Sequence, residues 1–447
     1  MGRYWKEYLE LYDTSTLDEE PMKLDPFGRV ASNYISEQDA FINLAVGSIR
    51  SGKTVAAIVA FLRFIHDSVH TYFAMAGKTL KALERNVVRP MKGIMRYLGI
   101  QYYHHKKDGE IDLFNMGDCK KTIVLYSIEK KGSDEVIKGS TYGGALLDEV
   151  TVMDMEGLDM MISRNSLKGA RIFMTCNPAN PNNKINQEYV LDEELQKMGY
   201  VKVTNFLLED NLSLTPEYIQ RVKKIYPEDS VFYKRNILGL WASGQGLIYT
   251  GFTDKNIYHE DKPLDYYDYL EIGSDYGSSS TTCWILGGIK EFEDHNEYDL
   301  IAEGGYNAKR EGMGVTDYEI TEMIYDMQEE YHLTAENIFY PSHDASSLEI
   351  ELRKNKKIEL SVEKFTPDVL KSIEQINSLF HVGYLHVHSR CSELINCIHG
   401  YEWDPRAARN GEDKPLKVDD HYCDAMRAPI MNHLWEDNAV GFLLGLG

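Results

Sequence analysis

Short apolar runs alternate with longer helical stretches in the first half of the chain. Residues 55–65 have the length and composition of a buried helix, and residues 79–98 predict a basic amphipathic helix that is kinked or split at Pro90. Strands followed by helices, repeated, are typical of a parallel sheet with helices on both faces. We therefore predict an α/β fold. The apolar runs that predict its buried strands are residues 41–46, 71–76, 146–147 and 171–175.

The pattern changes between about residues 240 and 251, where glycines precede a stretch rich in Tyr and Asp. Glycine-rich breaks of this kind are typical of domain boundaries. Beyond the break, residues 269–274 and 281–289 predict adjacent strands, and residues 368–380 and 391–399 predict helices. We expect an N-terminal arm, a first domain that ends in a lid region, and a second domain. Their residues are 1–40, 41–245 with the lid at about 205–245, and 246–447.

The length of 447 residues is too great for one ordinary core and also favours two domains. Lys and Arg number 48 against 70 Asp and Glu, so the net charge of −22 argues against a protein that coats nucleic acid. Contact with DNA would need local basic surfaces. Two clusters of basic residues could form such surfaces, and the alternative is that they are solvated helix faces. The clusters are Lys78, Lys81, Arg85, Arg89, Lys92 and Arg96, and Arg353, Lys354, Lys356 and Lys357.

The sequence does not have the features of a membrane protein or a secreted one. No run of about 18 apolar residues occurs, and residues 1–10 are polar and aromatic. Six scattered cysteines are too sparse for a disulfide scaffold, so we expect a reducing cytoplasm. His386, His388, Cys391, Cys397 and His399 are zinc-ligand residue types, but their spacing does not match a zinc site. We expect the two histidines at 386 and 388 to lie on one face of a strand and the two cysteines to pack a helix.

Residues 47–54 read GSIRSGKT and match the phosphate-binding pattern G-x-x-x-x-G-K-[ST]. The glycines let backbone N–H groups turn inward around phosphate oxygens, and the helix that follows adds its positive end. We expect Lys53 to reach the β- and γ-phosphates of a nucleotide and the Thr54 hydroxyl to hold Mg²⁺. The residues expected to bind the nucleotide in this loop are Gly47, Ser48, Arg50, Ser51, Gly52, Lys53 and Thr54.

An acidic pair follows the predicted strand at 146–147. Asp148 is the expected Mg²⁺ ligand, and Glu149 is placed to polarise the attacking water. The Glu after the Asp favours an ATP-hydrolysing motor over a kinase, because a kinase needs no water-activating base. The next predicted strand ends in Thr175-Cys176-Asn177-Pro178. A polar pair there, which includes the predicted nucleotide-binding residue Asn177, either senses the γ-phosphate and relays hydrolysis or belongs to a loop that the proline ends.

Three aspartates of the second half are candidate metal ligands. Asp275 and Asp344 follow predicted strands, and Asp424 lies in a C-terminal acidic cluster with His421, where we expect it to begin a helix. Three convergent acids can hold a pair of divalent ions that activates water and stabilises the leaving oxygen of a phosphodiester. His421 is then a nitrogen ligand or a proton shuttle. The alternative is that each aspartate is a solvated strand end.

Taken together, these motifs resemble the large subunit of tailed-bacteriophage terminases, which packages viral DNA. The resemblance runs from about residue 30 to about residue 430, with every motif in the family's order. It implies a P-loop ATPase domain of the ASCE, RecA-like type joined to an RNase H-like endonuclease domain. The matching segments are 47–54, 148–149, 175–178, the lid-like stretch from 210–213 to 238–241, 275–277, 343–344 and 420–427.

The resemblance also implies cofactors, catalytic residues and partners. The cofactors are ATP and Mg²⁺, with Mn²⁺ also accepted at the nuclease site. The catalytic residues are Glu149 for ATP hydrolysis and Asp275, Asp344 and Asp424 for DNA cleavage. The partners are double-stranded DNA, the portal of an empty capsid, a small terminase subunit, and further copies of the chain in a ring that we expect to be pentameric. No membrane is implied.

Two assignments and the competing functions stay open. Lys138 stands where the family often has the arginine of a trans-acting finger, so Arg50 and Arg164 are the alternatives. Gln38 either reads adenine or is a surface glutamine. One competing function is an ASCE helicase or repair ATPase fused to a nuclease, which the lack of a second RecA-like pattern disfavours. The other is an assembly factor that binds ATP only structurally, which Glu149 disfavours.

Overall fold

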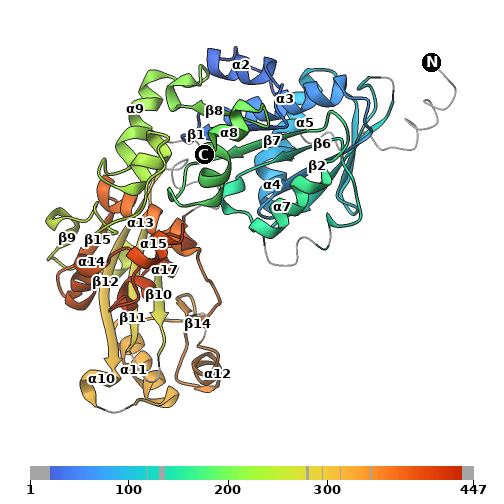
Figure 1. Cartoon of the computed structure of the whole chain (residues 1–447). Coiled ribbons are helices and arrows are strands. Elements are labelled where there is room, and N and C mark those ends of the chain that lie inside the picture. Colours follow the sequence, from blue (N-terminus) through green and yellow to red (C-terminus); the bar gives the residue numbers. More distant parts are fainter. Residues whose placement is uncertain are drawn as a thin grey trace. The chain divides into compact units, whose positions relative to one another are not determined.

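The computed structural model describes residues 21–434 except 118, 130–134, 136, 278–280, 294, 313 and 343–344. The described chain forms two compact units (Figure 1). The first contains the described residues up to Thr215 together with Arg235–Trp241, and the second contains Pro216–Lys234 and the described residues from Ala242 onward. Each unit combines helices with a sheet, so the predicted α/β class is confirmed.

An eight-stranded sheet forms the middle of the first unit. Its strands are β1 Ile42–Gly47, β2 Tyr72–Gly77, β3 Tyr102–His105, β4 Glu110–Leu113, β5 Lys121–Ser127, β6 Gly144–Leu147, β7 Arg171–Cys176 and β8 Val201–Phe206. Six of them run parallel in the order β5-β2-β6-β7-β1-β8, and β4 and β3 extend the β5 edge in antiparallel pairing. The four strands predicted from apolar runs are confirmed as β1, β2, β6 and β7.

Helices cover this sheet on both faces, as predicted (Figure 1). They are α2 Arg29–Ser36, α3 Lys53–Asp67, α4 Leu80–Leu83, α5 Arg89–Tyr97, α7 Met155–Arg164 and α8 Glu193–Lys197, with single turns at Val150–Val152, Asn186–Val190 and Leu208–Asp210. The predicted helix over 79–98 is split, because one π-helical turn, Glu84–Val88, separates α4 from α5. Pro90 is the second residue of α5, directly after this turn.

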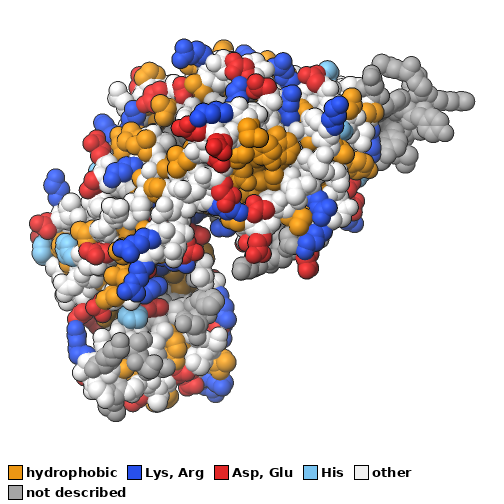
Figure 2. All heavy atoms as spheres, in the orientation of Figure 1, with side chains coloured by type: hydrophobic (Ala, Val, Ile, Leu, Met, Phe, Trp, Pro, Cys, Tyr) orange, Lys and Arg blue, Asp and Glu red, His pale blue; other side chains and the backbone are white. Residues whose placement is uncertain are grey.

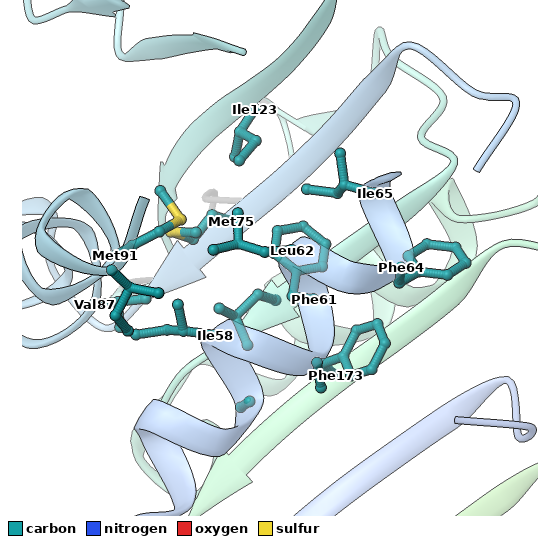
Figure 3. Close-up of a cluster of buried hydrophobic side chains, with 14 of the residues drawn as sticks. Ile58, Phe61, Leu62, Phe64, Ile65, Met75, Val87, Met91, Ile123 and Phe173 are labelled. Atoms are coloured by element: carbon teal, nitrogen blue, oxygen red, sulfur yellow. The ribbon is translucent and has the colours of Figure 1, made fainter. Parts of the chain in front are cut away.

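Alternating side chains along the strands build two apolar cores. In the first core, α3 packs against β2, β5 and β7, and the contacts include Ile58, Phe61, Leu62, Met75, Ile123 and Phe173 (Figure 3). In the second core, the opposite face of the sheet packs against α7, and the contacts include Ala74, Leu147, Ile172, Leu158 and Met161. Strand β1 is buried along its whole length, as expected for a central parallel strand. The two cores therefore fix the strand that leads into residues 47–54.

The second unit contains a seven-stranded mixed sheet in the order β14-β13-β10-β11-β12-β15-β9. Its strands are β9 Ile257–Tyr258, β10 Tyr269–Asp275, β11 Thr281–Glu291, β12 Asn296–Asn307, β13 Ile338–Tyr340, β14 Ser361–Val362 and β15 Leu385–His388. Strands β10, β11 and β12 are antiparallel neighbours, and the other pairs are parallel. The predicted adjacency of residues 269–274 and 281–289 is confirmed.

The helices of the second unit include the two that the sequence predicts, now α13 and α14. They are α9 Pro216–Ile225, α10 Ala308–Glu311, α11 Asp317–Glu330, α12 Ser346–Lys354, α13 Val369–Val382, α14 Ser392–Gly400, α15 Pro405–Arg409, α16 His421–Ala425 and α17 Arg427–Asn432, with single turns at Asp254–Asn256 and Leu264–Tyr266. A further turn, Tyr233–Ile237, begins in the second unit and ends in the first. The expectation that Asp424 begins a helix is wrong, since α16 starts at His421 and Asp424 is its fourth residue. Among the described residues, no helix is both long and apolar enough to cross a membrane.

Helix α16 lies directly against the sheet of the second unit. A Cβ added at Gly273 of β10 would lie 2.0 Å from the Ala425 carbonyl oxygen and 2.6 Å from Pro429. A real side chain cannot approach a backbone oxygen so closely, so glycine at this position allows the helix to pack on the strand. The packing brings the residues of α16 to the end of β10.

Candidate active sites

A tight turn joins β1 to α3 and contains the phosphate-binding pattern. Gly47 ends β1, and a Cβ there would lie 1.9 Å from the Phe206 carbonyl oxygen of β8, so the close approach of the two strands requires glycine. Gly52 caps α3 with a φ of 84°, a left-handed conformation that glycine adopts readily. Arg50 also has a positive φ, 54°. The local sequence therefore specifies a sharp turn where the pattern predicts one.

Hydrogen bonds hold this turn in place. The Ser48 N–H donates to the Phe206 carbonyl at 3.0 Å, and the Asn211 side-chain amide donates to the Arg50 carbonyl at 2.7 Å. The Ser51 hydroxyl donates to the Ser48 carbonyl at 2.8 Å and closes the turn on itself. A loop fixed in this way is organised before any ligand binds.

Lys53, the first residue of α3, directs its ammonium group back into the turn. It donates to the Ser48 carbonyl at 2.9 Å and to Asn177 Oδ1 at 2.6 Å, across 124 positions of sequence. Burial lowers the pKa of Lys53. The Ser48 hydroxyl oxygen is buried and has no hydrogen-bond partner among the described residues. A buried cation beside an unsatisfied hydroxyl fits a phosphate group, which would accept hydrogen bonds from both.

Asp148 directly follows β6 and is contacted by two hydroxyl groups. The Thr175 hydroxyl donates to Asp148 Oδ1 at 2.5 Å, and Thr54 Oγ1 lies 3.5 Å from the same oxygen. Burial raises the pKa of Asp148, and the Thr175 hydrogen bond opposes that rise. The structure thus brings the two predicted Mg²⁺ ligands together. Thr175 is absent from the predicted set of site residues, although a polar residue after three apolar ones in a buried strand is a recognisable signal.

Glu149 has left-handed backbone angles, φ 59° and ψ 48°, which are uncommon for a residue with a side chain. Its N–H donates to the Thr175 hydroxyl oxygen at 3.2 Å, so one hydroxyl holds both acidic residues. Burial, and then the charge on Asp148, raise the pKa of Glu149. A carboxylate whose pKa is raised is suited to take a proton from an attacking water.

The other predicted residues of this unit differ in exposure. Gln38 is buried and its side-chain amide donates to the Ile35 carbonyl at 2.6 Å, which excludes the alternative of a surface glutamine. Arg50 and Lys138 are exposed, whereas the Nε of Arg164 is buried without a hydrogen-bond partner among the described residues. An arginine that serves a neighbouring subunit needs an exposed head group. Of the two arginines, Arg50 meets that requirement better.

Asp275 and His421 form the centre of the second candidate site. Asp275 ends β10, His421 begins α16, and Asp275 Oδ2 lies 2.6 Å from His421 Nδ1. Burial raises the pKa of Asp275 against the His421 hydrogen bond, and the negative charges of Asp424 and Asp420 add to the rise. The same hydrogen bond raises the pKa of His421. The fold therefore brings His421 into contact with Asp275, and Asp424 lies near enough for its charge to act on Asp275.

Positively charged side chains surround Asp424. Its Oδ2 lies 2.8 Å from Lys417 Nζ, and its Oδ1 lies 2.7 Å from Arg427 Nη2. The Tyr401 hydroxyl donates to the same Oδ1 at 3.4 Å, and Lys417 Nζ lies 2.7 Å from Asp420 Oδ2. Lys417 is a residue that the sequence reasoning missed. Clustered carboxylate oxygens that need balancing by cations are donors that suit Mg²⁺ or Mn²⁺.

Asp344, the third predicted metal ligand, lies outside the described residues. Strand β13, which ends three residues before the undescribed positions 343–344, pairs in parallel with β10 through Tyr340 and Gly273. Among the described residues, no group of three or more His, Cys, Asp or Glu side chains could hold a metal ion. The site with three acidic ligands therefore stays a prediction, and its third ligand would come from the segment after β13.

The histidines and cysteines considered for zinc have separate partners. His386 Nδ1 lies 3.4 Å from an oxygen of Asp299, and His388 Nδ1 accepts the Arg390 backbone N–H at 3.0 Å. The Cys391 thiol donates to a backbone carbonyl oxygen. These contacts tie the strand β15 and its surroundings together, which is a packing role.

Ion pairs neutralise part of both basic clusters. Lys92 is buried and lies 2.9 Å from Glu84, and Lys357 lies 2.8 Å from Glu322. Arg353 donates to a backbone carbonyl oxygen at 2.6 Å. Basic and acidic side chains are interspersed over the face seen in Figure 2. Contact with DNA by these clusters stays a prediction, and Lys92 is not available for it.

Comparisons with known proteins agree with the motif resemblance. Residues 44–254 match the family model described as terminase large subunit, T4likevirus-type, N-terminal. No curated protein matches the chain. The solved structure of the large terminase from a thermophilic bacteriophage is similar, with 28% sequence identity and a TM-score of 0.82 over 92% of this chain and 100% of that chain.

Two further structures of the same bacteriophage protein are similar as well. The complex with ADP has 28% identity and a TM-score of 0.80, over 92% of this chain and 100% of that chain. The complex with ATP-γ-S has 27% identity and a TM-score of 0.78, over 91% and 98%. The family match includes the turn at 47–54, Asp148, Glu149 and Thr175, and the structural similarity extends over both units. By the family model over residues 44–254 and by the structural similarity over both units, the chain resembles the terminase large subunit.

Proposed function

We propose that this chain is the motor subunit of a viral DNA-packaging machine. It hydrolyses ATP to move double-stranded DNA through a portal into an empty capsid, and it cuts concatemeric DNA with a metal-dependent endonuclease. The observation that carries the proposal is the set of hydrogen bonds that joins the turn at 47–54 to the ends of β6 and β7. Through such a connection, a change at the nucleotide would act on the ends of two neighbouring strands.

In the ATPase site, each residue has a distinct task. Lys53 donates to phosphate oxygens and stabilises the negative charge that develops in the transition state. Thr54 and Asp148 would hold Mg²⁺, and the Glu149 carboxylate would accept a proton from the attacking water. Asn177 accepts a hydrogen bond from Lys53 and would therefore respond when Lys53 donates to a phosphate instead. When bound, Mg²⁺–ATP supplies the transferable phosphoryl group and the counter-charge for it.

In the nuclease site, Asp275 and Asp424 are the described carboxylates that would hold divalent ions, with Asp344 as the third ligand. His421, which contacts Asp275, either joins the ligands or moves a proton through its ring nitrogens. Lys417 and Arg427 orient Asp424 and limit the repulsion among the carboxylates. Bound Mg²⁺ or Mn²⁺ would supply the activation of water and the charge for the leaving oxygen.

The partners and location that we propose for the chain are those that its resemblance to terminase large subunits implies. The chain would act in the host cytoplasm, transiently docked on the portal, as one member of a ring that we expect to be pentameric. A small terminase subunit would select the viral DNA. Because catalysis addresses phosphates rather than base edges, cleavage by the chain itself should show little sequence preference.

The ATPase half is tested with the variants Lys53→Ala and Glu149→Gln. Lys53→Ala should abolish ATP hydrolysis, and Glu149→Gln should bind ATP but turn it over slowly. Lys197→Ala, which removes an exposed lysine of α8, is the matched control and should hydrolyse ATP at the parent rate. ATP turnover at the parent rate in Lys53→Ala would remove the phosphate-binding assignment.

The nuclease half is tested by plasmid cleavage in Mn²⁺ with Asp275→Asn. Cleavage should be lost, while ATP hydrolysis continues and reports that the variant is folded. Asp326→Asn, on the exposed face of α11, removes an acidic side chain of the same unit and serves as the control. If Asp275→Asn cuts as fast as the parent, the nuclease site lies elsewhere.

A further inference from the structure

Two cysteines of the second unit meet beside the candidate nuclease site. The Sγ atoms of Cys397 in α14 and Cys423 in α16 lie 3.1 Å apart, and both residues are free thiols. Cys423 is fully buried, whereas Cys397 is 8% exposed. A disulfide bond is about 2.05 Å long, so the two sulfur atoms would have to approach by roughly 1 Å.

Helix α16 connects this contact to the site. It is five residues long, and Cys423 lies between His421, which contacts Asp275 at 2.6 Å, and Asp424. Asp424 is held in turn by Lys417 and Arg427 at 2.8 and 2.7 Å. A bond from Cys423 to α14 would therefore act on the one helical turn that carries two of the proposed site residues.

The geometry points to a redox modification site, in which Cys397 and Cys423 close to an intramolecular disulfide and the closed form cuts DNA more slowly. The effect on cleavage rests on the proposed nuclease function, but formation of the bond does not. In a cytoplasmic protein, a disulfide of this kind is transient and responds to redox conditions rather than serving as a permanent crosslink.

The reaction balances with a low-molecular-weight disulfide as oxidant. The thiolate of Cys397, the more exposed of the two, attacks one sulfur of the small disulfide and releases one small thiol. Cys423 then attacks the Cys397 sulfur of the mixed disulfide and releases the second small thiol. The two cysteines lose two electrons and two protons in total, and the small disulfide gains them to become two thiols.

The remaining cysteines supply the controls. Cys119 is exposed and would form bonds between molecules, so its replacement by Ser gives a clean parent protein. Cys391 is buried in the same unit, and its thiol donates to the Leu300 carbonyl, a contact that a serine hydroxyl can replace. Cys391→Ser is therefore matched to Cys397→Ser in residue type, burial and position along the chain.

The experiment exposes the Cys119→Ser protein to 2-hydroxyethyl disulfide and counts free thiols before and after removal of the reagent. Two thiols should be lost, and peptide mapping should identify a crosslink between Cys397 and Cys423. Plasmid cleavage in Mn²⁺ should fall about tenfold or more, because displacements near 1 Å have effects of that order on catalysis. ATP hydrolysis should be unchanged, and dithiothreitol should restore cleavage.

The added Cys397→Ser substitution should make cleavage resistant to the reagent, and added Cys391→Ser should not. Thermal unfolding and ATP hydrolysis show whether the Cys397→Ser variant is folded. If it is not, the Cys423→Ala variant is used in its place. Absence of the linked peptide in folded protein would overturn the modification site. A linked peptide with undiminished cleavage would overturn the effect on activity.

These outcomes are separable from a failure of the proposed function. If the reduced parent does not cleave DNA, the nuclease proposal fails, but thiol counting and peptide mapping still test the bond. In that case slower deuterium exchange of residues 421–425 in the oxidised protein supports the link to α16. Unchanged exchange of those residues would contradict it.

Discussion

Thr175 should contribute to ATP hydrolysis although it is not among the residues predicted to form the site. Its hydroxyl donates to Asp148 Oδ1 at 2.5 Å and accepts the Glu149 N–H at 3.2 Å. Thr175→Val keeps the shape and β-branching of the side chain but removes both hydrogen bonds. The buried Asp148 then loses a donor, and the left-handed backbone of Glu149 loses the contact at its N–H.

The size of the effect follows from the charge of the acceptor. A hydrogen bond to a charged group contributes about 1.5–3 kcal/mol, and about 1.36 kcal/mol corresponds to a tenfold change in rate. If the contact to Asp148 is needed throughout the reaction, kcat should fall about 10- to 100-fold. Affinity for ATP should change much less, because the contacts of Lys53 and the turn at 47–54 are untouched.

The assay is steady-state ATP hydrolysis together with direct measurement of nucleotide binding. Thr175→Ser, which retains the hydroxyl, is the matched control and should stay within about threefold of the parent, since the hydrogen bond to a charged group is kept. Thermal unfolding establishes that both variants are folded. If Thr175→Val hydrolyses ATP as fast as Thr175→Ser, the hydroxyl does not organise the acidic pair and the reasoning is refuted.

Three other substitutions have expected outcomes. Burial raises the pKa of the Glu149 carboxyl in the folded protein above its value in the unfolded chain. Protonated Glu149 therefore favours folding below the unfolded-state pKa, and this contribution is lost as the pH rises through the folded-state pKa and the buried carboxylate becomes charged. Glu149→Gln should therefore unfold at a higher temperature than the parent at neutral pH, with a smaller difference in mild acid, in thermal melts over pH. Gly273→Ala should lower the free energy of unfolding by about 1–3 kcal/mol, because the new methyl group overpacks against Ala425, and it should also slow cleavage. Gly400→Ala is the control and should change neither, because a Cβ there meets no atom within 4 Å. Asp275→Asn should abolish plasmid cleavage at any Mn²⁺ concentration, whereas recovery at high Mn²⁺ would indicate that Asp275 only strengthens metal binding.

The part of the site that lies within one stretch of sequence was predictable. Residues 47–54 carry their own turn, because Gly47 allows the close approach of β8 and Gly52 adopts the left-handed conformation. Asp148 and Glu149 follow an apolar run, and parallel strands of this type end at the same edge of a sheet. The hydrogen bond between Lys53 and Asn177 depends on that common edge. The pattern at residues 47–54 therefore does not predict this hydrogen bond by itself.

Other features depend on packing that the sequence pattern does not contain. The polar position of Thr175 at the end of an apolar strand is visible in the sequence, but the contact of its hydroxyl with Asp148 depends on how β6 and β7 pair. The π-helical turn at Glu84–Val88 interrupts a stretch whose spacing is helical throughout. Strands β9 and β14 are two residues long, which is too short to show any periodicity. The place of Asp424 within α16 depends on where the helix starts, and it starts directly after Asp420.

The measurement that tests the central proposal most directly is DNA packaging with purified parts. The chain, its small-subunit partner and portal-bearing empty capsids from the same virus are mixed with linear double-stranded DNA and ATP, and the DNA protected from an added nuclease is measured. The account predicts protection that requires ATP, is lost in Lys53→Ala and is retained in Asp275→Asn, because precut DNA needs no further cleavage. Protection by Lys53→Ala equal to the parent, or ATP hydrolysis by the parent without any protected DNA, would contradict it.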